Sequence, residues 1–289
     1  MIKRFLQLAA FAIWLSASAS QAESKVVLGQ IGISFYAVTG QVVQAVLERL
    51  GHEVELRTGS HSEIFPELGD KRVDLLVAAW LPSAHASYWE RHGSDALQLA
   101  TLYRGARLFW AVPHYVPVSA VSAVEDLKKP EVAGRMVKLI RGTGADSGLM
   151  IGSRKIMASY DLADSGYQLL AGKHAQWNDY FMDNYAAQHW FVMPYFRPNY
   201  LNRIADMRML EEPLGLLGEE NDGVLVAHKA FVRNAPARTI ETLKRVSLDL
   251  AAVAEMDYRV RIDGRTPAEA AREWMAQNAA RVDAWFVEG

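Results

Sequence analysis

Residues 73–82 read VDLLVAAWLP, and this stretch decides the fold. From Val73 to Ala79 the chain is almost continuously apolar, which is typical of a strand buried on both faces in a parallel sheet. The run ends in Trp80-Leu81-Pro82. The sequence therefore predicts a buried strand whose carboxyl end carries an aromatic residue followed closely by a Pro.

Two units with the same order of elements make up most of the chain. In the first, residues 26–33 and 53–57 have strand patterns, with apolar residues at helical spacing between them. Ser60 and Glu63 form a capping-box pattern that opens a short helix before the 73–79 strand. The second unit has strand patterns at 136–140, 167–170 and 190–193 and helical patterns at about 147–160 and 173–187. This repeated βαβαβ order predicts an α/β fold built from doubly wound sheets.

The two units predict two lobes that share a cleft. A strand at 108–112 connects the units at a crossover between the lobes. The last part of the chain must return to complete the first lobe, with a strand at 224–227 and helices at about 229–234, 236–256 and 267–280. We expect a signal peptide at 1–22, a first lobe made of 23–108 and 212–289, and a second lobe made of 109–211.

Each unit ends in an aromatic residue, one further residue and a Pro. These triplets are Trp80-Leu81-Pro82 and Phe196-Arg197-Pro198. In open α/β sheets, ligands bind beyond the carboxyl ends of the strands, so the two aromatic residues are expected to face a shared cleft. The alternative is that both triplets are ordinary turns, because aromatic-Pro turns are common in loops.

The amino-terminal residues have the pattern of a secretory signal peptide. Lys3 and Arg4 precede an apolar run that is too short to span a bilayer, and small residues stand at Ser20 and Ala22. Cleavage is expected before Glu23, which places the protein in the periplasm. The chain has no Cys, which excludes a lipid-bearing Cys, disulfides and thiolate metal sites. Cleavage lowers the formal net charge of −2 by two more units, and this near-neutral charge argues against nucleic acid as a partner.

The segment 74–85, DLLVAAWLPSAH, and the Tyr88-Trp89 pair after it resemble the substrate-binding proteins of glycine betaine, proline betaine and choline ABC importers. The resemblance continues through 102–113, 140–148, 198–201 and 210–213 and includes Glu273-Trp274 near the end. It implies a two-lobed periplasmic binding protein of type II, similar to cluster F, which closes over its ligand by a hinge motion. It also implies a monomer that delivers a quaternary-ammonium ligand to the membrane permease of an ABC importer.

The resemblance further implies a box of aromatic rings around the ligand's trimethylammonium group. Trp80 matches a Trp that forms one wall of this box. Phe196 and Tyr200 stand where many relatives carry Trp, and Asn199 stands where many carry His. These departures keep the aromatic character but leave the identity of the ligand open. Two further candidates for the walls are the tyrosines Tyr36 and Tyr195.

A quaternary ammonium is a cation without an N–H group, so ring faces are a suitable way to hold it. Each face attracts such a cation by roughly 0.5 to 2 kcal/mol. The loop 142–148, GTGADSG, precedes a helix, and its free N–H groups near Gly144 and Ser147 are candidates for binding a carboxylate. The alternatives are core packing for the aromatic residues and a plain turn for the loop. His85 is expected to fix the turn after Pro82.

Other classes of function remain open at this point. A hydrolase is disfavoured because the chain has neither a G-x-S-x-G elbow nor an H-E-x-x-H pair, and its eight His are scattered. We therefore expect no catalysis, no metal and no cofactor. The same fold with another small cation or an amino acid as ligand stays an alternative, as does a sensor.

Overall fold

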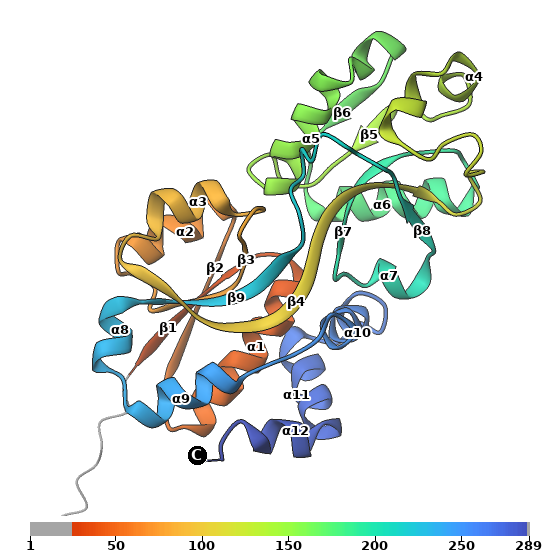
Figure 1. The fold of residues 1–289 in the computed structure, drawn as a ribbon. Coiled ribbons are helices and arrows are strands. Elements are labelled where there is room, and N and C mark those ends of the chain that lie inside the picture. Colours follow the sequence, from red (N-terminus) through yellow and green to blue (C-terminus); the bar gives the residue numbers. More distant parts are fainter. Residues whose placement is uncertain (1–24, 288–289) are drawn as a thin grey trace, which may run out of the picture.

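The computed structural model describes residues 25–287 and shows a mixed α/β protein with two lobes (Figure 1). The signal peptide expected at 1–22, with its cleavage site, lies outside the described residues. One continuous path of strands runs β2-β1-β3-β9-β4-β7, and β8 pairs with β4. Its strands are β1 Val26–Ile31, β2 Val54–Gly59, β3 Leu75–Leu81, β4 Ala96–Pro113, β7 Met193–Arg197, β8 Met207–Met209 and β9 Asn221–His228. A separate pair consists of β5 Leu139–Arg141 and β6 Gln168–Leu170.

The first lobe has the predicted parallel unit at its centre. β1 pairs in parallel with β2 and β3, and every residue of β3 is buried. Helix α1 contacts β1 and β3 on one side and the C-terminal helices α10 and α11 on the other. The helices of this lobe and of the C-terminal region are α1 Ser34–Arg49, α2 His61–Gly69, α3 Ala86–His92, α8 Lys229–Asn234, α9 Ala237–Arg245, α10 Leu250–Arg261, α11 Pro267–Gln277 and α12 Ala279–Ala284.

The second lobe contains β5 to β8 and the helices between them (Figure 1). β5 and β6 are parallel, as a doubly wound unit requires, whereas β7 runs antiparallel to β4. The helices are α4 Pro130–Ala133, α5 Gly148–Ser159, α6 His174–Ala186 and α7 Leu201–Ile204, with 3-10 turns at Val124–Lys128 and Leu162–Ser165. The strand expected at 190–193 lies later, at 193–197, so the aromatic-Pro triplet forms its carboxyl end.

The strand between the lobes is longer than the sequence indicated. β4 pairs with β9 from Ala96 to Ala106 and then changes partner, pairing with β7 and β8 from Arg107 to Pro113. The predicted strand at 108–112 is therefore only its second half. Three irregularities interrupt the pairing with β9, and Gly105 has a φ of 79°, a backbone conformation that glycine adopts without strain. The lobe boundaries expected at 108 and 211 stay a prediction.

The prediction of a single helix at 236–256 is wrong, because the structure has two helices there, α9 and α10. Val246 has an extended backbone at the end of α9, and the Leu248 N–H donates to the carbonyl of Leu102 on β4. Asp249 then starts α10, because its carboxylate accepts the N–H of Ala252 at 2.7 Å. In the same way, the helix expected at 267–280 ends at Gln277, and α12 follows.

Candidate functional site: an aromatic cavity between the lobes

Trp80 stands at the end of β3, where the strand is irregular. The pairing of β3 with β9 shifts between Leu76 and Ala79, and Ala78 has a φ of 58°, which is rare for a residue with a side chain. Such bulges turn the side chains that follow them in a new direction. The Trp80 N–H then donates to Nδ1 of His85 at 2.9 Å, while the His85 N–H donates back to the Trp80 carbonyl at 2.9 Å. His85 therefore fixes the turn, as expected from the sequence.

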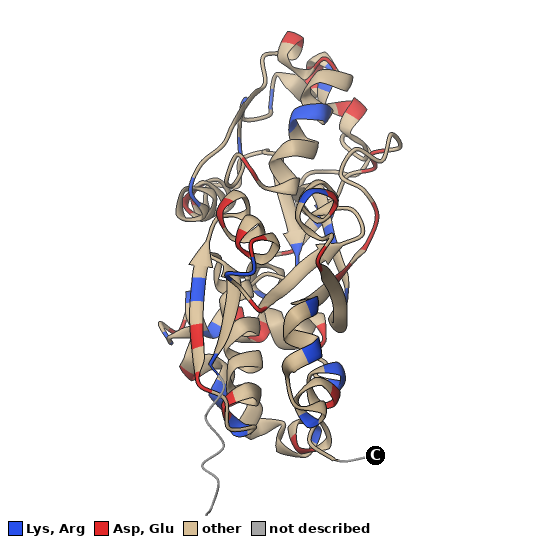
Figure 2. Ribbon diagram, turned by 90° about the vertical axis from the view of Figure 1, so that its left-hand side faces the viewer, with Lys and Arg blue, Asp and Glu red and all other residues tan. Residues whose placement is uncertain are grey.

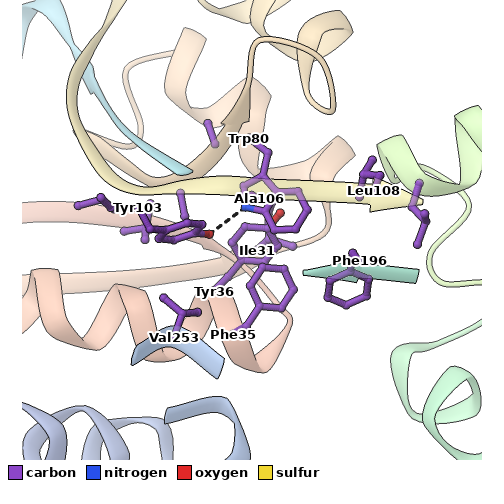
Figure 3. Packing of buried hydrophobic residues seen from close by; sticks show 14 of the residues in the cluster. Ile31, Phe35, Tyr36, Trp80, Tyr103, Ala106, Leu108, Phe196 and Val253 are labelled. Atoms are coloured by element: carbon purple, nitrogen blue, oxygen red, sulfur yellow. Dashed lines mark hydrogen bonds between the residues drawn. The ribbon is translucent and has the colours of Figure 1, made fainter. Parts of the chain in front are cut away.

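The indole of Trp80 is held from behind by a second buried ring. Its Nε1–H donates to the hydroxyl of Tyr103 on β4 at 2.8 Å (Figure 3). Tyr103 lies so close to β9 that a Cβ at Gly223 would stand 2.3 Å from its ring. Gly223 thus leaves room for Tyr103, and Tyr103 in turn fixes the rotation of the indole. Three neighbouring strands cooperate in placing one side chain.

Three aromatic rings from both lobes meet in front of Trp80 (Figure 3). Phe35 and Tyr36 come from the start of α1, and Phe196 comes from β7 in the second lobe. The ring centroid of Phe35 lies 5.5 Å from that of Trp80 and 5.3 Å from that of Phe196. Trp80 and Phe196 are 6.2 Å apart in an edge-to-face arrangement, and Tyr36 lies 6.0 Å from Trp80. All four rings are buried, and together we call them the ring cluster.

Phe196 has its own support within the second lobe. Its ring stacks on Trp177 of α6 at 5.2 Å, with an angle of 27° between the planes. The Trp177 Nε1–H donates to the carbonyl of Pro194 at 2.8 Å, which ties α6 to β7. Trp177 is fully buried and supports the ring of Phe196. Each lobe therefore holds its ring, Trp80 or Phe196, on a packed and hydrogen-bonded base.

The ring cluster lines a small cavity of about 30 Å³. This aromatic cavity is bounded by Ile33, Phe35, Tyr36, His61, Trp80, Ala84, His85, Leu108, Thr143, Ser147, Gly148, Leu149 and Phe196. A volume of this size holds no more than about one water, so a larger molecule enters only if the lobes move apart. The sequence predicted that Trp80 and Phe196 face one cleft, and the structure places both on this cavity.

A wider and more polar chamber adjoins the aromatic cavity. It has a volume of about 740 Å³ and shares Ile33, His61, Thr143 and Ser147 with the cavity. Gly144 lines this outer chamber. Ser147 caps helix α5, because its Oγ accepts the Met150 N–H at 3.2 Å, and it lies 3.1 Å from the hydroxyl of Thr143.

Three predicted site residues, Tyr195, Asn199 and Tyr200, line neither the aromatic cavity nor the outer chamber. Tyr195 precedes Phe196 in β7. Its ring contacts Phe109 and, like that of Phe196, Trp177, but it is not among the residues that line the cavity. The Tyr200 N–H donates to the carboxylate of Asp257 on α10 at 2.7 Å, and its ring faces Arg261.

Asn199 is occupied by the turn that follows Phe196. Its Nδ2 donates to the Phe196 carbonyl, and its Oδ1 accepts the Leu201 N–H at 2.8 Å. Tyr195 therefore lies next to Phe196 in β7, Asn199 holds the turn after it, and Tyr200 contacts α10. Phe35 was not predicted as a site residue, although its ring contacts the other three rings of the cluster and the adjacent Phe35-Tyr36 pair in the first βα unit was a visible signal.

Comparison with known proteins identifies the family. Residues 24–277 match the family model of the substrate binding domain of ABC-type glycine betaine transport systems. The chain belongs to this family. It is a family of transport proteins and not of enzymes.

Individual members are only distantly similar in sequence. The glycine betaine/carnitine transport binding protein GbuC of Listeria monocytogenes is 21% identical over 157 residues, which cover 54% of this chain and about half (52%) of that relative. The crystal structure of lactococcal OpuAC, closed and complexed with glycine betaine, has a TM-score of 0.81 at 22% identity and covers 91% of this chain and 100% of that one. An ABC-transporter choline binding protein in complex with choline has a TM-score of 0.77 at 16% identity, covering 90% and 91%. At these identities the structures establish the shared two-lobed fold.

In this family member, the titratable groups around the aromatic cavity are held neutral. Burial lowers the pKa of His61 from 6.5 to about 4, although Asp146 opposes this shift. Burial and the neighbouring His61 keep the pKa of His85 well below its usual value, and burial raises the pKa of Tyr36. Among the residues that line the aromatic cavity, none is Asp or Glu. A cation in this cavity therefore meets aromatic faces and neutral imidazoles.

Residues 25–287 lack two further features. No group of three or more His, Cys, Asp or Glu side chains in this range is arranged to hold a metal ion. No helix within the same range combines the length and the apolar character that crossing a membrane requires.

Proposed function

We propose that this chain is the solute-binding subunit of an ABC importer and that it captures a quaternary-ammonium osmolyte such as glycine betaine or choline. The observation that supports the proposal is the ring cluster, in which Phe35, Tyr36 and Trp80 of one lobe oppose Phe196 of the other. The trimethylammonium group binds among these four rings when the lobes open and close around it.

The rings suit this ligand on energetic grounds. Each desolvated face attracts a cation by roughly 0.5 to 2 kcal/mol, so four faces supply about 2 to 8 kcal/mol before ordering costs. Micromolar binding needs about 8 kcal/mol net, so the rings supply a large part of it and other contacts supply the rest. A primary ammonium would lose the hydrogen bonds that its N–H groups make with water, since ring faces replace them poorly.

The charge of the lining favours a zwitterion over a simple cation. The aromatic cavity has no carboxylate to balance a buried positive charge, and a ligand with its own carboxylate brings the balance with it. We place that carboxylate at the start of α5, near Gly144 and Ser147, where N–H groups at a helix N-terminus attract anions. Thr143 and neutral His61 stand beside this position as polar neighbours, and the carboxylate of Asp146, which also lines the outer chamber, bonds to Ser62 of the first lobe.

The cellular setting follows from the same proposal. The mature protein begins at Glu23 after removal of residues 1–22, works in the periplasm as a monomer and delivers its ligand to a membrane permease. It needs no cofactor, performs no catalysis and does not bind nucleic acid. In the view of Figure 2, acidic and basic residues are interspersed along the ribbon, which is consistent with the last point.

A thermal unfolding panel tests the proposed ligand. A ligand at 100 times its Kd stabilises the folded state by about 2.7 kcal/mol, which raises the Tm of a chain of this size by about 5 to 10 °C. We expect this shift with glycine betaine and a smaller one with choline. Dimethylglycine and glycine have the same carboxylate but carry N–H groups, so we expect progressively smaller shifts from them. A shift from an amino acid or polyamine, together with none from any methylated ammonium compound, would overturn the proposal.

A further inference from the structure

The two lobes touch at a second place, beside the aromatic cavity. Asp146 lies in the loop between β5 and α5 of the second lobe. Its Oδ2 accepts two hydrogen bonds from Ser62 at the start of α2, from the N–H at 3.0 Å and from the hydroxyl at 3.0 Å. Its carbonyl accepts a third, from the hydroxyl of Tyr88 on α3 at 2.9 Å. All three donors belong to the first lobe.

The charge state of Asp146 suits this contact. Burial raises the pKa of its carboxyl, but the hydrogen bonds from Ser62 and the proximity of His61 outweigh burial and hold the pKa below its usual value. The side chain is therefore an acceptor throughout the neutral range. Hydrogen bonds to a charged acceptor are among the stronger ones in proteins.

A glycine two residues further on allows the lobes to come this close. A Cβ at Gly148 would lie 2.2 Å from the carbonyl oxygen and 3.0 Å from the carbonyl carbon of Ala84, in the turn after Trp80. Both are backbone atoms of the first lobe, so they cannot move aside as a flexible side chain does. Gly148 begins helix α5 and has no positive φ, so an Ala here fits its own helix. Only the approach of the other lobe requires a glycine.

We propose that Asp146 and Gly148 are positioning residues that close the cleft, and that they set how long the ligand stays bound. This inference rests on the proposed function. Gly148 lets the backbone of the second lobe reach Ala84, and Asp146 then bonds to Ser62 and Tyr88. The same approach brings Phe196 to the rings of the first lobe. Because these bonds form only when the lobes meet, they stabilise the closed state alone and slow the release of ligand.

Two variants, one single and one double, remove contacts between Asp146 or Gly148 and the first lobe without changing the ring cluster. Gly148→Ala should prevent full closure. The double substitution Ser62→Ala with Tyr88→Phe removes two of the three bonds from the first lobe and leaves the 143–147 loop unchanged. Two controls match these changes. Gly69→Ala adds a Cβ whose nearest neighbour is 3.4 Å away, and Tyr115→Phe removes a hydroxyl bond to the His189 carbonyl inside one lobe.

Closure can be measured directly, because the chain has no Cys of its own. Spin labels on Cys introduced at the exposed positions Glu90 of α3 and Lys155 of α5 report the distance between the lobes. We expect one short distance for the unmodified background with saturating glycine betaine. With Gly148→Ala the distance should lengthen, and the dissociation rate in stopped flow should rise at least tenfold. The double variant should also release glycine betaine about tenfold faster, with a nearly unchanged association rate.

The outcomes separate this inference from the proposed function. If Gly148→Ala and the double variant keep the short distance and the dissociation rate of the background, the closure contact is refuted. If glycine betaine, choline and other methylated ammonium probes fail to bind the background, the proposed function fails. The closure contact is then tested by the label distances measured without ligand.

A population with the short distance that decreases in Gly148→Ala and in the double variant, but not in the controls, supports the closure contact. If no such population exists in the background, the closure contact is refuted.

Discussion

Replacing Trp80 by Ala is the most direct test of the aromatic cavity. The indole is buried, and its neighbours Phe35, Tyr36 and Phe196 all have ring centroids within 6.2 Å of it. The substitution removes one cation-binding face, worth roughly 0.5 to 2 kcal/mol, together with its van der Waals contacts and the order of the other rings. We expect a total loss of about 2 to 3 kcal/mol, which weakens the Kd for glycine betaine by about 30- to 150-fold.

The same substitution must also destabilise the fold, because Trp80 is a packed residue and not only a cavity wall. Truncating a buried Trp to Ala costs about 3 to 5 kcal/mol, and the hydroxyl of Tyr103 loses its hydrogen-bond donor. A loss of affinity alone is therefore ambiguous. Trp274→Ala is the matched control, since Trp274 is equally buried but lies on α11, outside the lining of the aromatic cavity.

The assay combines calorimetric titration with urea unfolding at a temperature where both variants are folded. Both should lose similar stability, and only Trp80→Ala should lose affinity. Trp80→Phe should fall between the background and Trp80→Ala, because it keeps a ring face but not the bond to Tyr103. Equal affinities for Trp80→Ala and the background, or equal losses in both variants, would refute the assignment of Trp80 to the ligand.

Three further predictions concern the surroundings of the cavity. Tyr103→Phe leaves the Trp80 Nε1–H without its acceptor, so we expect the free energy of unfolding to fall by about 1 to 3 kcal/mol and the binding of glycine betaine to weaken several-fold. An unchanged Kd would show that the indole does not need this hydrogen bond. Gly223→Ala places a Cβ 2.3 Å from the Tyr103 ring, so urea unfolding should show a loss of about 1 to 3 kcal/mol, and a stable variant would contradict the packing described. The pKa of His61 is about 4 in the folded protein against 6.5 in the unfolded chain, so the unfolded chain binds this proton at a higher pH. The free energy of unfolding should therefore fall by up to about 3 kcal/mol as the pH drops from 6.5 toward 4. His61→Asn should flatten this part of the pH profile, and an equally steep profile in the variant would assign the loss to other groups.

Much of the fold was predictable because its signals are local. The apolar run at 73–79 and the repeated βαβαβ order follow from periodicity alone. The parallel pairing of β1 with β2 and β3 confirms the first unit, and in the second unit β5 and β6 pair in parallel. The extent of β4 was not predictable in this way. Its first half pairs with β9, which lies more than a hundred residues later, and a change of partner within one strand leaves no periodic signal. The break between α9 and α10 depends likewise on a distant carbonyl, that of Leu102.

The turns after two strands were the clearest sequence signal of the candidate site. Trp80 and Phe196 were found from the Pro that follows each strand, and both line the cavity. Tyr195 shows a limit that the sequence itself imposes, since two successive residues of a strand cannot both face the cleft. Phe35 was missed because the first helix begins earlier than its apolar periodicity suggested, at Ser34, so its first turn reaches the cavity. The positions of Tyr200 and Asn199 depend on a contact with α10 and on hydrogen bonds within their own turn, and no sequence pattern predicts these contacts.

The division of the ring cluster between the lobes links affinity to movement. An open first lobe offers a cation three faces, from Phe35, Tyr36 and Trp80, and closure adds the fourth, from Phe196. A ligand shifts the equilibrium between the open and closed lobes only by the difference between its binding free energies for these two states. That difference includes one ring face of roughly 0.5 to 2 kcal/mol and the desolvation that strengthens the other three. A ligand without methyl groups gains little from the fourth face, so it should bind weakly and also leave the lobes apart. Selectivity and closure therefore arise from the same contact.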